Sequence, residues 1–154
     1  MDLKDLKKLY GELAGKYKLP SFSELNEDFE IEKIKRGEET LLRTVRKTMM
    51  EKIVNSMNFL EFLLNPVNAP RLYLPYIKSM TSDDRKDIDE LYGKLAEVML
   101  AALGLEIEYS EKGEAEMIKR ASNVWNESKP GFNKIIAKLQ KPVTFEKKER
   151  SYFG

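Results

Sequence analysis

A chain of 154 residues is the size of one ordinary domain and is long enough to bury one hydrophobic core. With 42% hydrophobic residues it is too apolar for a disordered chain, and its net charge of +1 lacks the domain-wide positive excess typical of nucleic-acid-binding proteins. The chain has no cysteine and no histidine, which excludes disulfides, thiolate nucleophiles, Ser–His triads and the usual zinc ligands.

Membrane and export signals are also missing from the sequence. No segment approaches the roughly 18 uncharged apolar residues that a membrane span needs, and the opening MDLKDLKKL has no apolar signal segment. We therefore expect a cytoplasmic protein without a membrane partner.

Two helices are expected before residue 30. Apolar side chains three and four residues apart predict the first helix, which ends before Pro20 because a residue preceding proline disfavours the helical conformation. These side chains are Leu3, Leu6, Tyr10, Leu13 and Tyr17. Either Ser21 or Ser23 can cap the second, short helix, whose apolar face contains Phe22, Leu25 and Phe29.

The longest expected helix begins near Ile31 and runs toward Leu64, with Gly37 as a point where it bends or divides. Its apolar stripe contains Ile31, Ile34, Leu41, Leu42, Val45, Met49, Ile53, Met57, Leu60 and Leu64. Three prolines between residues 65 and 75 predict a loop or irregular turn, followed by about one helical turn in LYLPYIKSM.

The second half of the chain predicts two further helical segments and a break. Thr81 or Ser82 caps a strong helix with acids in its first turn, which continues to about Tyr109. Its inward side contains Ile88, Leu91, Tyr92, Leu95, Val98, Met99 and Ala102. After a break at residues 110–113 a last helix begins, with an apolar stripe of Ala115, Ile118, Ala121 and Trp125. We expect Pro130-Gly131 to interrupt it before Pro142 ends the bundle. The sequence thus predicts an all-α, single-domain, irregular antiparallel bundle of five or six helices over residues 1–142, with an extended C-terminal tail over 143–154.

Charge is distributed in blocks of alternating sign. Residues 21–42 carry 7 acids and 3 bases, 43–80 carry 2 and 6, and 81–109 carry 8 and 3, which gives net charges of −4, +4 and −5. In an antiparallel bundle such blocks can face one another and help to fix the order of packing. Most charged residues are therefore interpreted as solvated helix faces or mutual partners.

Two sets of acids could in principle hold magnesium. Asp83, Asp84 and Asp87 match the DDxxD pattern of isoprenoid synthases, although helix N-termini favour acids without any metal. A second set would resemble the all-helical nucleotide pyrophosphatases, with acids on two facing helices: Glu24, Glu27, Asp28 and Glu38 against Asp87, Glu90 or Glu114. A magnesium-dependent phosphohydrolase thus stays open as the least favoured function, and we expect no metal and no other cofactor.

A basic stretch offers a candidate contact for RNA. Arg36, Arg43 and Lys47 are spaced seven and four residues apart and share one helix face, with Arg46 beside them and opposite much of the apolar stripe. Phosphates could bind along this face. The alternative is that these bases meet the acidic blocks of the same chain.

Aromatic and methionine side chains give further candidates. Trp125 and the methionines at 49, 50, 57, 80 and 99 are expected in the core, where methionine fills irregular gaps. Tyr73 and Tyr76, in the proline-rich segment, form either a lid over the core or an exposed patch for a partner.

The C-terminal KPVTFEKKERSYFG combines aromatic residues with bases. Phe145, Tyr152 and Phe153 could contact a partner protein, while Lys147, Lys148 and Arg150 could meet phosphate or an acidic surface. The alternative is that the aromatic side chains dock on the bundle.

Segments such as KLPSFSELNEDFEIEKI and NFLEFLLNP resemble uncharacterised small, charged helical proteins of archaeal genomes. The resemblance covers about residues 1–110 and implies no activity. The sequence therefore predicts a non-enzymatic accessory or adaptor protein that binds another protein or itself. A ribosome- or RNA-associated factor is the alternative.

Overall fold

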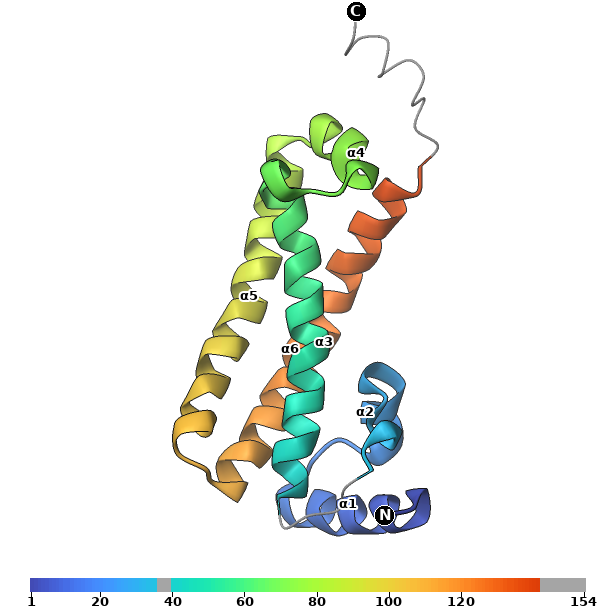
Figure 1. Ribbon diagram of the computed structural model, residues 1–154, viewed down its shortest axis with the longest axis vertical. Coiled ribbons are helices and arrows are strands. Elements are labelled where there is room, and N and C mark those ends of the chain that lie inside the picture. The colour runs from blue at the N-terminus through green and yellow to red at the C-terminus, as the bar shows by residue number, and fades with distance from the viewer. Residues whose placement is uncertain (36–39, 142–154) are drawn as a thin grey trace, which may run out of the picture.

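The computed structural model describes residues 1–35 and 40–141, and this part of the chain contains six α-helices, three short 3₁₀ helices and no β-strand (Figure 1). The predicted all-α bundle is confirmed. The elements in chain order are α1 (Leu3–Tyr17), α2 (Phe22–Phe29), η1 (Ile31–Lys33), α3 (Leu41–Leu64), η2 (Pro66–Asn68), η3 (Arg71–Tyr73), α4 (Leu74–Ser79), α5 (Ser82–Ile107) and α6 (Glu111–Leu139).

Several helices begin at caps that the sequence predicts. The Ser21 hydroxyl accepts a hydrogen bond from the Glu24 backbone N–H (3.1 Å), and the Glu24 carboxylate accepts one from the Ser21 N–H (3.3 Å). Thr81 and Asp84 form the same reciprocal pair at the start of α5. These bonds satisfy backbone donors that the first turn of a helix leaves unpaired.

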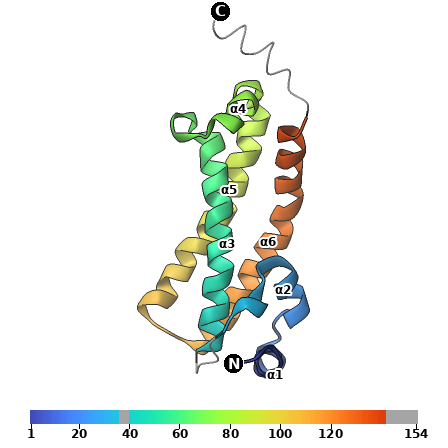
Figure 2. The ribbon, with the colours of Figure 1, turned by 45° about the vertical axis from the view of Figure 1, so that its right-hand side comes forward.

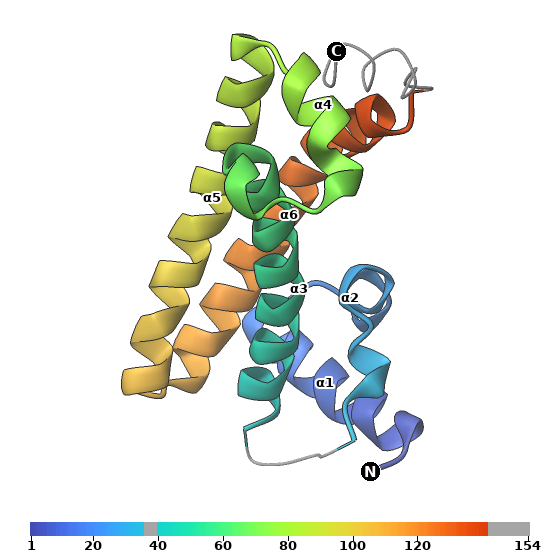
Figure 3. The same cartoon turned by 45° about the horizontal axis from the view of Figure 1, so that its top comes forward.

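Helices α3, α5 and α6 run up, down and up and form the body of the molecule (Figures 1 and 2). Helix α1 lies across the lower end, α2 packs beside α3 and α6, and α4 covers the upper end (Figures 1 and 3). The Phe29 ring of α2 contacts the Trp125 ring of α6, with centroids 5.7 Å apart. This arrangement leaves α5 with no helix on its outer side among the described residues (Figures 1 to 3).

The core fills the space between the three long helices. Its fully buried side chains come from all of them, and most belong to the apolar stripes that the sequence predicts. They include Val45, Met49, Ile53 and Leu60 of α3, Ile88, Leu95 and Val98 of α5, and Ala115, Ile118 and Ala121 of α6.

The predicted start of the longest helix is wrong. Ile31 and Ile34 are buried as expected, but residues 31–33 form a 3₁₀ turn and α3 begins at Leu41. Side chains three residues apart share a face in both kinds of helix, so the spacing of Ile31 and Ile34 cannot distinguish them. Gly37 lies outside the described residues.

The predicted interruption at Pro130 is also wrong, because α6 continues through it and is longer than α3. Proline removes one helical hydrogen bond and costs about 3 kcal/mol inside a helix. Trp125 on one side of Pro130 and Phe132 and Ile135 on the other are all buried in the same core. The free energy gained by burying both halves of α6 therefore outweighs the cost of a proline inside the helix.

The connection between α5 and α6 is shorter than predicted. Helix α5 ends at Ile107, and the Ser110 hydroxyl caps α6 by accepting a hydrogen bond from the Gly113 N–H (3.1 Å). Within residues 1–35 and 40–141, no helix combines the length and apolarity needed to cross a membrane.

Candidate functional site

A buried ion pair joins α3 to α6 at the lower end of the bundle. Arg46 donates from Nε to Glu114 Oε2 (2.7 Å) and from Nη2 to Glu114 Oε1 (2.9 Å). Only 3% of Arg46 and none of Glu114 is exposed. The two parallel hydrogen bonds match the flat guanidinium to the carboxylate, and together with Glu106 they raise the pKa of Arg46.

Glu106 of α5 extends this pair toward the surface. Its carboxylate accepts from Arg46 Nη1 (2.7 Å) and from Arg43 Nη2 (3.1 Å), and Lys47 Nζ lies 3.8 Å away. The hydrogen bonds from Arg46 and then Arg43 lower the pKa of Glu106 below its usual value. We call Arg43, Arg46, Lys47, Glu106 and Glu114 the charged cluster. Three bases proposed for RNA contact are thus partnered by carboxylates of the same chain.

The expectation that Arg46 lies opposite much of the apolar stripe is wrong. It follows Leu42 by four residues and precedes Met49 by three, so it belongs to the same buried helix face. Arg43 and Lys47 remain at the edge of that face and are partly exposed. Helix spacing alone would have indicated this position for Arg46.

Seven further residues proposed for RNA or partner contact lie outside the described residues. These are Arg36, Phe145, Lys147, Lys148, Arg150, Tyr152 and Phe153.

Two of the three DDxxD acids bind lysines of α6 rather than converge on one another. Asp84 pairs with Lys138, and Asp87 pairs with Lys134 at 3.3 Å. The hydrogen bond that Lys138 donates to the Asp84 carboxylate lowers the pKa of Asp84 and raises the pKa of Lys138. These contacts tie the first turns of α5 to the last turns of α6.

The acids of the second proposed magnesium set are similarly separated. Asp28 pairs with Lys129 at 2.5 Å, Glu24 caps α2 and Glu114 belongs to the charged cluster. Glu38 lies outside the described residues. Within the part of the chain that the structure describes, no three carboxylates are grouped in a way that could hold a metal ion.

Tyr73 and Tyr76 lie in the cover of the upper end. Tyr76 is buried, with 6% exposed, and burial followed by the negative charge of Asp84 raises its pKa. Tyr73 is half-buried, with its ring 5.6 Å from that of Phe59 and 6.3 Å from that of Phe62. Trp125, Met49 and Met50 are buried, while the methionines at 57, 80 and 99 pack against the core.

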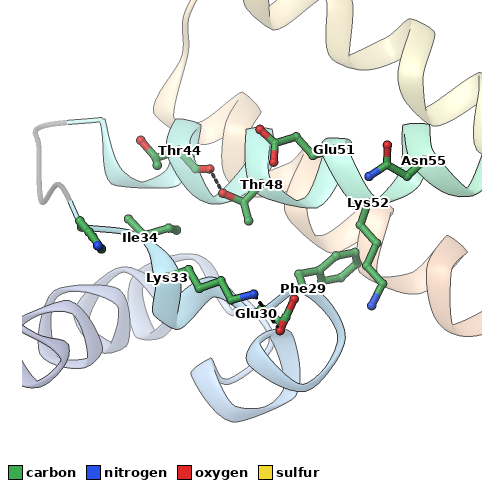
Figure 4. A pocket seen from close by; sticks show the side chains of 10 residues that line it. Phe29, Glu30, Lys33, Ile34, Thr44, Thr48, Glu51, Lys52 and Asn55 are labelled. Atoms are coloured by element: carbon green, nitrogen blue, oxygen red, sulfur yellow. Dashed lines mark hydrogen bonds and ion pairs between the residues drawn. The ribbon is translucent and has the colours of Figure 1, made fainter.

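A groove of about 780 Å³ separates the α2–η1 segment from α3 (Figure 4). Its lining includes the Lys33–Glu30 ion pair (3.0 Å) and Thr48, whose hydroxyl donates to the Thr44 carbonyl (2.9 Å). Lys52 lies over the rings of Phe29 and Trp125. The contact of Lys52 with Phe29 joins α3 to α2, whereas the ion pair lies within the α2–η1 segment and the Thr48 bond lies within α3.

Among the three long helices, the large apolar side chains with the highest exposed fractions lie on the outer face of α5. Leu100, Leu103 and Ile107 are 67%, 54% and 89% exposed and are spaced three and four residues apart. The same line continues through Ala96 and Gly93 toward the start of the helix. We call these five residues the α5 face. A line of this kind on one helix matches the seam through which helices pair.

An apolar groove borders the α5 face. It has a volume of about 560 Å³ and lies between α3 and α5, with Met50, Val54, Met99 and Leu103 among its lining residues. The charged cluster closes its lower end through Lys47 and Glu106. The exposed apolar surface therefore spans two helices.

The sequence predicts the inward side of α5, and its outer side is also apolar. The signal was present, because residues 95–107 contain only two charged residues, Glu97 and Glu106. A helix that is apolar all round is normally covered on every side. In the described residues, α5 is covered on one side only.

Comparison with known proteins identifies no relative: no family model, no curated protein and no solved structure matches the chain.

Proposed function

We propose that this protein is a non-enzymatic accessory or adaptor protein that acts by binding another protein or a second copy of itself. The observation that carries the proposal is the α5 face, where Leu100, Leu103 and Ile107 form an exposed apolar line on a well-packed helix. Apolar patches of this kind mark contact sites, because their burial against a partner removes apolar surface from water. We assign the charged cluster a structural role, since its bases already form ion pairs with carboxylates of the same chain.

Affinity capture from the native cell tests the proposal. A tagged wild-type chain should retain a stoichiometric partner protein, and the double variant Leu100→Glu, Ile107→Glu should lose it, because charge on this face prevents burial. The control is Leu72→Glu, which changes an equally apolar side chain that is 72% exposed at the other end of the molecule. A wild-type chain that retains no protein, or a partner that the double variant still binds, would contradict the proposal.

The alternative is RNA association through the basic residues, which requires a change in their ion pairs. Arg43 and Lys47 would have to exchange Glu106 for phosphate. It predicts an RNA complex that weakens steeply with salt and is lost on charge reversal at Arg43 and Lys47. A captured complex that resists salt and ribonuclease favours the protein partner.

A further inference from the structure

We infer that the α5 face pairs with the α5 face of a second copy of this chain, with the two helices antiparallel about a twofold axis near Leu100. The inference deepens the proposed function, because it rests on the same surface and names its occupant. Three observations support it: the gradient of side-chain size along the face, the distribution of charge beside it and the apolar groove that adjoins it.

Side-chain size changes along the α5 face from small to large. Gly93 and Ala96 lie at its upper end, Leu100 at its middle, and Leu103 and Ile107 at its lower end. A Cβ atom placed on Gly93 would meet nothing within 4 Å, so the space above this glycine is open in the single copy. The face is about 21 Å long, from the helical rise of 1.5 Å per residue over residues 93–107.

An antiparallel twofold pairing matches small residues with large ones. Rotation about an axis at Leu100 places Ile107 of one copy over Gly93 of the other, and Leu103 near Ala96. Both ends of the interface then repeat the same contact. A parallel pairing would place Ile107 against Ile107 and Gly93 against Gly93, which would leave a gap at one end.

Charge on the α3 side of the α5 face fits the same orientation. On this side Arg43 and Lys47 outnumber Glu106 at the lower end, because Glu114 already neutralises Arg46. At the upper end of this side lies Glu61, whose carboxylate accepts a hydrogen bond from the Tyr92 hydroxyl (3.1 Å). Antiparallel pairing brings the basic end of one copy to the acidic end of the other.

The groove between α3 and α5 enlarges the surface that such a pair would bury. Met50 and Val54 of α3 line it together with Met99 and Leu103 of α5. A twofold axis across α5 also places α3 of one copy beside α3 of the other, so the contact would be a four-helix arrangement. Methionine side chains can adapt to the partner in such a groove.

The sequence allows a geometric test by disulfide formation, because the natural chain has no cysteine. In Leu100→Cys the two introduced thiols would meet at the axis. Under mild oxidation this variant should form a covalent dimer at least about ten times faster than Leu72→Cys, whose residue is exposed to a similar degree. Equal rates for the two variants would overturn the inference.

A glycine substitution separates pairing from folding. Gly93→Gln should be accepted by the single copy, since its Cβ meets no atom and glycine is a poor helix former. It should nevertheless remove the space for Ile107 of the second copy. The matched control is Gly11→Gln in α1, where a Cβ also meets nothing within 4 Å.

Molar mass in solution gives the direct measurement. By light scattering or sedimentation at about 100 µM, the wild-type chain and Gly11→Gln should have the mass of a dimer, and Gly93→Gln and Leu100→Glu that of a single chain. Circular dichroism and thermal unfolding at low concentration establish that each variant is folded. If Leu100→Glu fails to fold, Gly93→Gln decides alone.

Two results of the mass measurement would overturn the inference, namely a wild-type chain that stays monomeric, or a dimer that neither substitution dissociates. A monomer whose captured partner is lost with Leu100→Glu would overturn the pairing of copies while the proposed function stands. A dimer of the expected geometry that captures no other protein would support the pairing and contradict the adaptor function.

Discussion

The charged cluster and the α5 face lie at the same end of the bundle, and they reverse the usual positions of charged and apolar side chains. In the charged cluster, Arg46 and Glu114 are buried together. On the α5 face, Leu100 and Ile107 remain in contact with water. A charge can be buried when an opposite charge satisfies its hydrogen bonds, and apolar side chains remain exposed where no other part of the protein covers them.

This comparison separates stability from recognition. The buried pair contributes specificity to the packing of α3 on α6, because neither partner can move away without leaving an unpaired charge in the core. The α5 face contributes little to the fold of a single copy. Its exposed area is available for binding, so substitutions in the two regions should affect different measurements.

The largest effect on the free energy of unfolding is expected from breaking the buried ion pair of Arg46 and Glu114. Glu114→Ala should lower the free energy of unfolding by about 3 to 5 kcal/mol, because it leaves the Arg46 guanidinium buried without its main partner. Urea unfolding monitored by circular dichroism measures this loss. The exposed pair of Lys134 and Asp87 is the control, and Lys134→Ala should cost about 1 kcal/mol or less.

The double variant Arg46→Met, Glu114→Met tests whether an unpaired buried charge causes this loss of stability. It replaces both charges with flexible apolar side chains, while Glu106 keeps Arg43 and Lys47 as partners. Its stability should return to within about 1 kcal/mol of the wild type. A double variant as unstable as Glu114→Ala would show that shape, rather than unpaired charge, accounts for the loss.

A smaller effect is expected when the pH is lowered. The pKa of Glu106 lies below its ordinary value of 4.5, and that of Asp84 lies below 3.8, because Arg46 and Lys138 hold their charged forms. The unfolded chain therefore binds protons first as the pH falls. The stability that these carboxylates contribute is complete above about pH 4.5 and is lost as the pH falls through their folded-state pKa values.

Urea midpoints between neutral pH and the acid limit of folding measure this loss, which should be smaller than that of Glu114→Ala because both carboxylates are partly solvated. Glu106→Gln should flatten the acid branch of the curve. An unchanged acid branch in this variant would show that Glu106 does not contribute to it.

Most of the fold could be predicted because local rules decide it. The capping residues Ser21 and Thr81 and the apolar stripes of α3, α5 and α6 follow from spacing and side-chain chemistry. The continuity of α6 through Pro130 could not be predicted, since it depends on the tertiary burial of residues on both sides.

The candidate site was harder to predict than the fold. Arg46 was assigned to a basic face by its charge, although its spacing from Leu42 and Met49 indicates burial, and its partner Glu114 is 68 residues away in the chain. The exposure of Leu100 and Leu103 does not follow from the sequence, because apolar residues on a helix normally belong to the core. Which side of an apolar helix stays exposed depends on the packing of the other helices.

The smallest effect on the free energy of unfolding is expected from a substitution on the α5 face. At about 1 µM, where the proposed pairing of copies should not contribute, Leu100→Gln should change the free energy of unfolding by no more than about 0.5 kcal/mol. The reason is that Leu100 is mostly exposed and makes no part of the core. Chemical unfolding at this concentration and at about 100 µM should give the same midpoint for the variant, whereas the wild type should gain stability at the higher concentration, since association stabilises the folded state by mass action. A loss above about 1 kcal/mol in the dilute variant would mean that Leu100 is covered within its own chain, and the contrast between the two regions would then fail.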